Sequence, residues 1–207
     1  MKLQIKYNVT DLTKALELAH QTEEFADIME IGSLLIYKNG IAAVEAFSKA
    51  FPQKKLYIDA KITDQAEEAV RLYAQAGATY ISVVAESYNS TIKTACATAG
   101  EYNVHIILDC MNAQSLGQSA MDAKPLGAYG ILIHQITHTD SSNYPECELE
   151  DIRANTDLPI FIKGKINSDS IATIARLNPY AVILSDSITR AADPHTAAAY
   201  FHTLINP

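Results

Sequence analysis

The segment Leu56-Tyr57-Ile58-Asp59-Ala60-Lys61-Ile62-Thr63-Asp64 joins an apolar, strand-like run to three charged side chains. On a β-strand, side chains alternate between the two faces, so Asp59 and Lys61 lie on one face and the isoleucines on the other. Asp64 comes where a helical pattern begins, and a carboxylate is favourable at the positive end of a helix dipole. An isolated segment of this kind is equally well explained as a surface ion pair at the start of a loop.

The rest of the chain repeats this strand-to-helix transition. Between the apolar runs lie helical patterns, such as 12–19 and 66–74, with apolar residues at the i, i+3, i+4, i+7 spacing of one buried face. Alternating strands and helices predict parallel βαβ units, and eight of them in about 200 residues predict a (β/α)8 TIM barrel. The strand-like runs recur about every 25 residues and begin near Leu3, Ile28, Lys55, Tyr80, His105, Gly130, Pro159 and Ala181.

Two features disfavour an open, doubly wound sheet: the number of strands and the first turn, residues 7–11, which lacks a glycine-rich dinucleotide fingerprint. No linker or low-complexity segment interrupts the pattern, so we expect one domain over residues 1–207.

Composition limits the classes of function. The chain is 48% hydrophobic and 19% charged, which is typical of a globular protein. No apolar run reaches the roughly 20 residues of a membrane span, and the first residues lack the apolar core of a signal peptide. A formal net charge of −8 argues against nucleic acid as a partner. The three cysteines have no metal-ligand spacing, so we expect a cytoplasmic protein.

In a barrel of this type, catalytic side chains lie at the C-terminal ends of the strands. Glu30 sits in an apolar run and is expected to point into the barrel beside Asp59. Two carboxylates from adjacent strands would suit Mg2+, with Lys61 keeping both ionised and supporting an oxyanion. A simple Glu–Lys–Asp ion network is the alternative.

His134 ends the sixth strand and is a candidate proton carrier, because imidazole side chains exchange protons near neutral pH. The alternative is a histidine that only completes a hydrogen-bond network. Asn8, Glu86 and Asp109 also end strands, and the general need for a polar residue there explains them equally well.

Together these motifs resemble the orotidine 5′-phosphate decarboxylase superfamily, within it the branch of 3-hexulose-6-phosphate synthases and 3-keto-L-gulonate-6-phosphate decarboxylases. The likeness covers almost the whole chain and rests on Glu30-Ile31-Gly32, Asp59-x-Lys61-x2-Asp64, His134 and the segment 188–194.

The resemblance implies a homodimer of barrels with shared active sites, in which Asp64 reaches into the partner's site. It also implies that Glu30 and Asp59 bind Mg2+ and that Lys61 supports the enediolate of a sugar phosphate. In the synthases, the enediolate of D-ribulose 5-phosphate adds to formaldehyde; in the decarboxylases, a similar enediolate forms by loss of CO2.

Three positions depart from the family pattern. The first strand ends in Asn8 where the family has Asp, and an amide cannot act as a base. The seventh-strand turn is Gly164-Lys165 rather than Gly-Gly, so a side chain lies at the expected phosphate site. The eighth-strand turn is Ser185-Asp186, where a carboxylate would repel a phosphate unless it turned away or paired with Lys163, Lys165 or Arg190.

We therefore expect a Mg2+-dependent aldehyde-lyase of the synthase type. Asn8, Gly164, Lys165, Ser185 and Asp186 are the candidate substrate-binding residues. Decarboxylase activity is the first alternative, disfavoured because Thr137 stands where that branch has Arg. A barrel that has lost catalysis and binds a sugar acid or a protein partner is the second alternative, motivated by the three departures.

Overall fold

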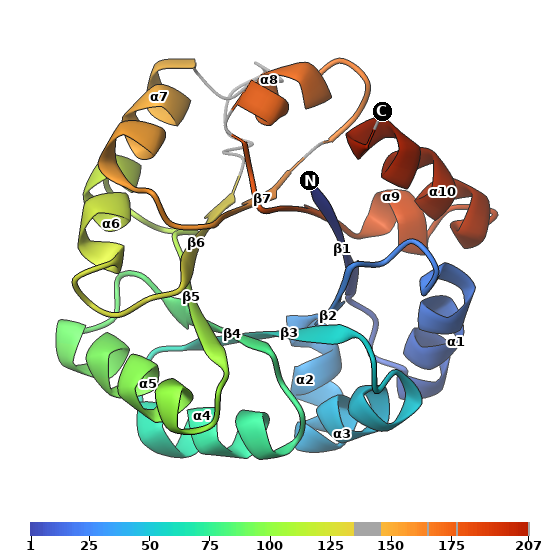
Figure 1. Cartoon of the computed structure of the whole chain (residues 1–207). Coiled ribbons are helices and arrows are strands. Elements are labelled where there is room, and N and C mark those ends of the chain that lie inside the picture. Colours follow the sequence, from blue (N-terminus) through green and yellow to red (C-terminus); the bar gives the residue numbers. More distant parts are fainter. Residues whose placement is uncertain (135–145, 165, 177, 207) are drawn as a thin grey trace.

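The computed structural model describes residues 1–134, 146–164, 166–176 and 178–206. Within them, eight parallel strands close a barrel in chain order, with helices around the outside (Figure 1). This confirms the predicted (β/α)8 barrel. The strands are β1 (Lys2–Tyr7), β2 (Ile28–Ile31), β3 (Lys55–Ile62), β4 (Tyr80–Val84), β5 (His105–Asp109), β6 (Gly130–His134), β7 (Ile160–Lys163) and β8 (Ala181–Leu184).

The helices follow their strands, with α2 and α3 separated only by Gly40 and with a short α9 placed after β8. Gly40 has a φ of +58°, which a glycine adopts readily. The helices are α1 (Leu12–Thr22), α2 (Ser33–Asn39), α3 (Ile41–Ala50), α4 (Ala66–Gln75), α5 (Asn89–Glu101), α6 (Leu116–Ala123), α7 (Glu146–Asn155), α8 (Ile171–Arg176), α9 (Asp186–Thr189) and α10 (Pro194–Ile205).

Each barrel strand has two buried faces. The outer faces and the helices form one apolar cluster, which includes Leu3 and Ile5 of β1 with Ala15 and Leu18 of α1. A second, smaller cluster fills the barrel interior and includes Tyr57, Tyr80 and Phe161. Polar side chains that alternate with outward apolar residues must therefore lie in the interior, because the other face is covered by helices.

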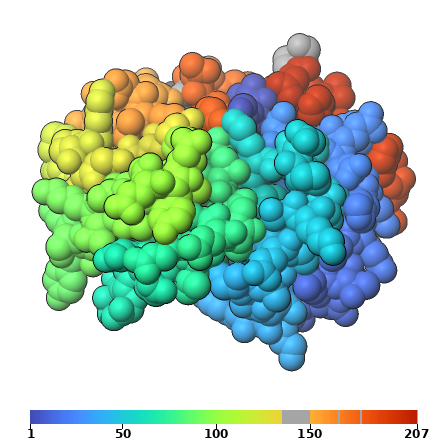
Figure 2. Space-filling view, turned by 60° about the horizontal axis from the view of Figure 1, so that its bottom comes forward, coloured from blue at the N-terminus to red at the C-terminus, as the bar shows by residue number. Residues whose placement is uncertain are grey.

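The strands begin within one residue of the predicted positions. Hydrogen bonding between β1 and β8 closes the barrel, and α1 packs against α10 across the same seam. Figure 2 shows the outer surface, where blue N-terminal segments lie beside red C-terminal segments. In the described part of the chain, no helix combines the length and apolar character needed to cross a membrane.

Candidate active site

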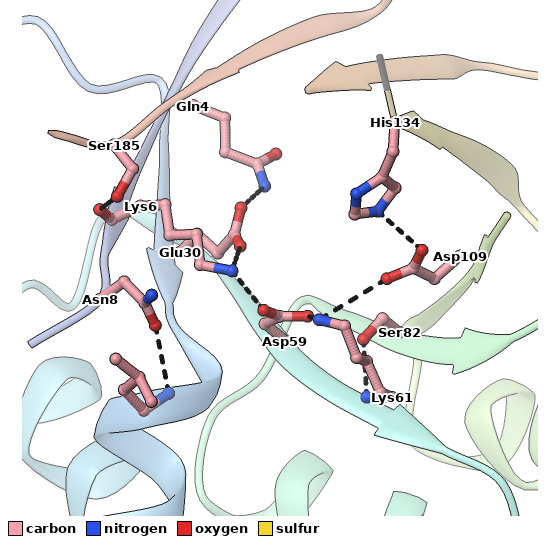
Figure 3. Close-up of polar contacts among 11 residues, drawn as sticks. Gln4, Lys6, Asn8, Glu30, Asp59, Lys61, Ser82, Asp109, His134 and Ser185 are labelled. Carbon is pink, nitrogen blue, oxygen red and sulfur yellow. Dashed lines mark hydrogen bonds and ion pairs between the residues drawn. The ribbon is translucent and has the colours of Figure 1, made fainter. Parts of the chain in front are cut away.

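Three neighbouring strands bring a lysine and two carboxylates together inside the barrel. The ammonium nitrogen of Lys6 (β1) lies 3.1 Å from Oε1 of Glu30 (β2) and also contacts Oδ2 of Asp59 (β3) (Figure 3). The Lys6 side chain is only 4% exposed and both carboxylates are 2% exposed. Gln4 completes the group by donating from Nε2 to Oε2 of Glu30 at 2.5 Å. Glu30 and Asp59 are thus neighbours, as the sequence predicted, but a lysine lies between them.

Lys6 and Gln4 were not among the residues predicted from the sequence, although the pattern of β1 indicates both. In Lys2-Leu3-Gln4-Ile5-Lys6, polar and apolar residues alternate, and the apolar ones pack under the helices. In an antiparallel sheet the polar face of such a strand can face water. In a closed barrel it faces the interior, so the predicted fold already implied a buried Lys6.

Lys61 extends the cluster from the same strand as Asp59. Its ammonium group contacts Oδ1 of Asp59 and lies 3.7 Å from Oδ2 of Asp109. The strand register shifts between Ile58 and Ile62, and Lys61 has a φ of +48°, which is rare for a residue with a side chain. Its backbone N–H donates to Oγ of Ser82 in β4 at 2.9 Å. Such local strain is typical of functional sites.

Asp109 and His134 form a carboxylate–imidazole pair at the ends of β5 and β6. Nε2 of His134 lies 2.8 Å from Oδ1 of Asp109, which is fully buried and also accepts a hydrogen bond from the backbone N–H of Met111. A carboxylate this close to the imidazole would stabilise its protonated form. Asp109, for which the sequence left a structural and a functional role equally open, therefore lies between His134 and Lys61.

The charges of the cluster shift the pKa values of its members. Burial would raise the pKa of Asp59, but the charges of Lys6 and Lys61 outweigh this and hold the pKa well below its usual range. Burial would lower the pKa of Lys6, but Glu30 and Asp59 raise it above its usual value. Lys6 and Asp59 are therefore both ionised at neutral pH. Lys163 (β7), near the same carboxylates, has a pKa lowered mainly by burial.

A cavity of about 510 Å³ opens beside this cluster at the ends of β6, β7 and β8. Its lining combines cationic and polar groups with an apolar floor. It is lined by His134, Lys163, Gly164, Ile166, Asn167, Ile183, Leu184, Ser185, Asp186 and Ser187. Gly164, Ser185 and Asp186 are thus brought to one cavity with His134, whereas Lys165 and Thr137 lie outside the described residues.

At this cavity the Asp186 carboxylate pairs with Arg190, and the Ser185 hydroxyl forms a hydrogen bond to strand β1. The Asp186 carboxylate lies 3.4 Å from Nε of Arg190, one turn along, and its side chain is 64% exposed. The Ser185 hydroxyl donates to the backbone oxygen of Lys6 at 3.0 Å, tying the end of β8 to β1. Arg190 thus offsets the negative charge that Asp186 would otherwise present to an anion.

Asn8 faces helix α2 instead of the charged cluster. Its Oδ1 accepts from the backbone N–H of Leu34 at 3.1 Å, which caps a helix whose own N-cap residue, Gly32, has no side chain to do so. A Cβ on Gly32 would come within 2.6 Å of the same oxygen, which explains the glycine of the Glu-Ile-Gly motif. The structure thus gives Asn8 a structural contact.

Asp64 is also separate from the cluster. It is exposed just before α4, and its Oδ1 accepts from the backbone N–H of Gln65 at 2.7 Å. A role for Asp64 in the active site would therefore require a second subunit.

The predicted Mg2+ site does not fit the residues around Glu30 and Asp59. All four carboxylate oxygens contact side-chain nitrogens of the chain itself: those of Gln4, Lys6 and Lys61. Three carboxylates (Glu30, Asp59, Asp109) face three lysines (Lys6, Lys61, Lys163), so no excess negative charge attracts a divalent ion. Among the described residues, no group of three or more His, Cys, Asp or Glu side chains could hold a metal. The arrangement matches the alternative, an ion network, with Lys6 as an added member.

Comparisons with known proteins agree with this architecture. The chain is 29% identical over 209 residues to 3-hexulose-6-phosphate synthase of Bacillus subtilis (strain 168), covering 99% of both chains. It is 30% identical over 202 residues to the enzyme of that name from Staphylococcus aureus (strain bovine RF122 / ET3-1), covering 96% of this chain and 95% of the relative.

Among solved structures, 3-hexulose-6-phosphate synthase from Salmonella typhimurium superposes with a TM-score of 0.91 at 26% identity, covering 100% of this chain and 99% of the other. The model of the family described as "Orotidine 5'-phosphate decarboxylase / HUMPS family" matches residues 1–201. The predicted resemblance is confirmed: the chain belongs to the orotidine 5′-phosphate decarboxylase / HUMPS family.

Proposed function

We propose that this protein is an aldehyde-lyase of the 3-hexulose-6-phosphate synthase type, which forms the enediolate of a ketose phosphate and adds it to formaldehyde. The observation that carries the proposal is the connected set Lys61–Asp109–His134, which ends at the cavity. It supplies the two groups that enediolate chemistry needs, a proton carrier and a cation near the developing oxyanion. The relatives that share the fold and bear this name support the same assignment.

The proton carrier is His134. Its imidazole removes a proton from C1 of D-ribulose 5-phosphate, the electrons of the C–H bond form the C1–C2 double bond, and the C2 carbonyl oxygen becomes anionic. Asp109 holds the imidazole and stabilises the imidazolium that results. C1 of the enediolate then attacks formaldehyde, C2 becomes a carbonyl again, and the new alkoxide takes the proton from His134.

The oxyanion support is Lys61. Its side chain is 20% exposed, whereas that of Lys6 is 4% exposed, so Lys61 is the more accessible of the two lysines to a ligand. Asp59 and Asp109 fix its position through two ion pairs, so little reorganisation is needed as charge develops on the substrate oxygen. No step of this proposal passes through Mg2+, because Glu30 and Asp59 are occupied by lysines.

The phosphate would bind in the cavity at the ends of β7 and β8. Lys163 lines it, and backbone N–H groups near Gly164 and Ser185 with the side chain of Lys165 would add donors. A phosphate dianion beside Lys163 would also favour its charged form, against the effect of burial.

We further propose a cytoplasmic homodimer in which Asp64 enters the partner's site. The exposure of Asp64 supports the dimer, because the side chain is free to meet a second subunit. The free thiols of Cys96 and Cys110 support the cytoplasm, which is a reducing compartment.

Deuterium exchange at C1 of D-ribulose 5-phosphate in D2O, followed by NMR, tests the proposal before the second substrate is added. We expect wild-type protein to catalyse exchange, and His134→Gln and Lys61→Ala to lower its rate by roughly 10²–10⁴-fold. His20→Gln, which changes a histidine on the exposed surface of α1, is the matched control and should leave the rate unchanged.

Absence of exchange in folded wild-type protein would contradict the proposal and favour the barrel that has lost catalysis. Exchange that survives in both His134→Gln and Lys61→Ala would contradict the roles assigned to these residues.

A further inference from the structure

The position of Lys6 carries an inference of its own. We propose that the Lys6 ammonium group is a built-in cation that fills the place of a divalent metal ion between Glu30 and Asp59, so that this protein does not bind Mg2+ there. The inference concerns cation binding by the free protein and does not depend on the identity of the substrate.

The first support is the way Lys6 engages the carboxylates. One ammonium group reaches Oε1 of Glu30 and Oδ2 of Asp59, oxygens on two different strands. A metal ion bound by both carboxylates would have to lie between them, where the Lys6 ammonium group already lies. The other oxygens, Oε2 of Glu30 and Oδ1 of Asp59, contact Gln4 and Lys61.

The second support is that Lys6 is held in place. Its strand pairs with β2 on one side and β8 on the other, and its backbone oxygen also accepts the Ser185 hydroxyl. Lys6 stands directly beside Glu30 in the β1–β2 register. With 4% of the side chain exposed, displacing the ammonium group would mean moving it within a packed interior.

The third support is charge. A divalent ion added while Lys6 and Lys61 remain would put four positive charges beside Glu30 and Asp59, which carry two negative ones. In an interior of low effective dielectric, that excess repels the incoming ion strongly.

The inference gives Lys6 the role of a positioning residue. It contacts both carboxylates, and Asp59 in turn contacts the ammonium group of Lys61. The positive charge that a metal would bring to this end of the barrel is thus supplied by the chain itself.

The test is binding of Mn2+, used as a paramagnetic probe and competed with Mg2+, measured by electron paramagnetic resonance on the full chain. We expect wild-type protein to show no saturable Mn2+ site that Mg2+ displaces. Lys6→Met and Lys6→Ala remove the ammonium group and leave both carboxylates, so they should gain one site and bind Mn2+ at least about tenfold more tightly than wild type.

Two control variants show whether the gained site is the one proposed. Lys2→Met removes a lysine from the same face of the same strand but from the end next to Tyr180, and it should gain no site. Glu30→Gln combined with Lys6→Met removes one of the two carboxylates and should abolish the gained site.

A saturable, Mg2+-competed site in wild-type protein that Glu30→Gln removes would overturn the inference. This measurement needs no Lys6 variant to fold. Folded Lys6→Met and Lys6→Ala proteins that gain no site would also overturn it. If deuterium exchange at the substrate fails while these binding results hold, the proposed function is contradicted and the inference stands.

Discussion

The two ends of the barrel interior are built from the same strands but hold opposite kinds of side chain. At the C-terminal end, β1, β2, β3, β5 and β6 contribute an ion network that runs from Glu30 through Lys6, Asp59, Lys61 and Asp109 to His134 (Figure 3). At the N-terminal end, β3, β4 and β7 contribute aromatic rings in tilted and edge-on contact, with Tyr57, Tyr80 and Phe161 within 6.4 Å of one another by ring centroids.

Tyr57 marks the boundary between the two ends. Its ring belongs to the aromatic cluster, and burial is the main cause that raises its pKa, followed by the charges of Glu30, Asp109 and Asp59. Two residues further along β3, Asp59 begins the ion network. The same alternation of side chains along the strands thus places aromatic rings in the N-terminal half of the barrel interior and charged groups at its C-terminal end, where the cavity opens.

The largest stability difference between the two ends should follow from removing a buried charge. Lys6→Met leaves Glu30 and Asp59 without their shared partner, and we expect a loss of about 3–5 kcal/mol in the free energy of unfolding. Denaturation by urea measures this change. At the aromatic end, Phe161→Leu keeps most of the apolar volume and should cost less than about 1.5 kcal/mol.

Equal losses of unfolding free energy in Lys6→Met and Phe161→Leu would contradict the proposed difference between the two ends, because the ion network would then contribute no more to stability than ordinary packing. A loss of deuterium exchange in Phe161→Leu would also count against it, since the aromatic end would then take part in catalysis.

The pH dependence of this difference is a second prediction. Asp59 has a lowered pKa, so its contribution to stability is present above the ordinary value of 3.8 and is lost as pH falls further. Lys6 has a raised pKa, so its contribution is present below the ordinary value of 10.5 and is lost as pH rises further. The gap in unfolding free energy between wild type and Lys6→Met should therefore be largest between these values and shrink outside them. A gap that stays the same below the lower value and above the higher one would contradict this explanation.

The smallest predicted effect lies at the N-terminal end. Burial would raise the pKa of Tyr180, but hydrogen bonds with Lys2 and Tyr80 outweigh it and lower the pKa to about 8. Ultraviolet absorbance should show one tyrosine ionising near this pH, and Lys2→Met should move that ionisation upward. Because the pKa is lowered on folding, Tyr180 should stabilise the protein increasingly as pH rises from about 8 toward 10. An unchanged titration in Lys2→Met would remove Lys2 as the cause.

The sequence predicted the barrel well because its signals are local. The starts of the strands follow from apolar runs at a constant spacing. The proximity of Glu30 and Asp59 follows because the C-terminal ends of the strands meet at one end of the barrel. The contacts among the site residues could not be predicted in the same way, because they join residues that are far apart in the sequence. Lys6 and Asp59 are 53 positions apart, and Asp109 becomes part of the site only through its approach to Lys61 and His134.

The Mg2+ prediction failed to anticipate the same contacts between residues that are far apart in the sequence. Two carboxylates at neighbouring strand ends indicate a cation, but their positions do not say whether the cation is a metal ion or a lysine. The alternation in β1, taken together with a closed barrel, would have put Lys6 in the interior. The place of Asn8 at a strand end predicts contact with the substrate, but it does not predict that Oδ1 of Asn8 caps α2 in place of the missing side chain of Gly32.

We propose that the C-terminal end of the barrel forms an enediolate with positive charge supplied by lysines. The rate of C1 deuterium exchange from D-ribulose 5-phosphate, measured in excess EDTA and then with excess Mg2+, tests this proposal. We expect exchange in EDTA at a rate that Mg2+ does not raise. Exchange that appears only after Mg2+ is added would contradict the proposal.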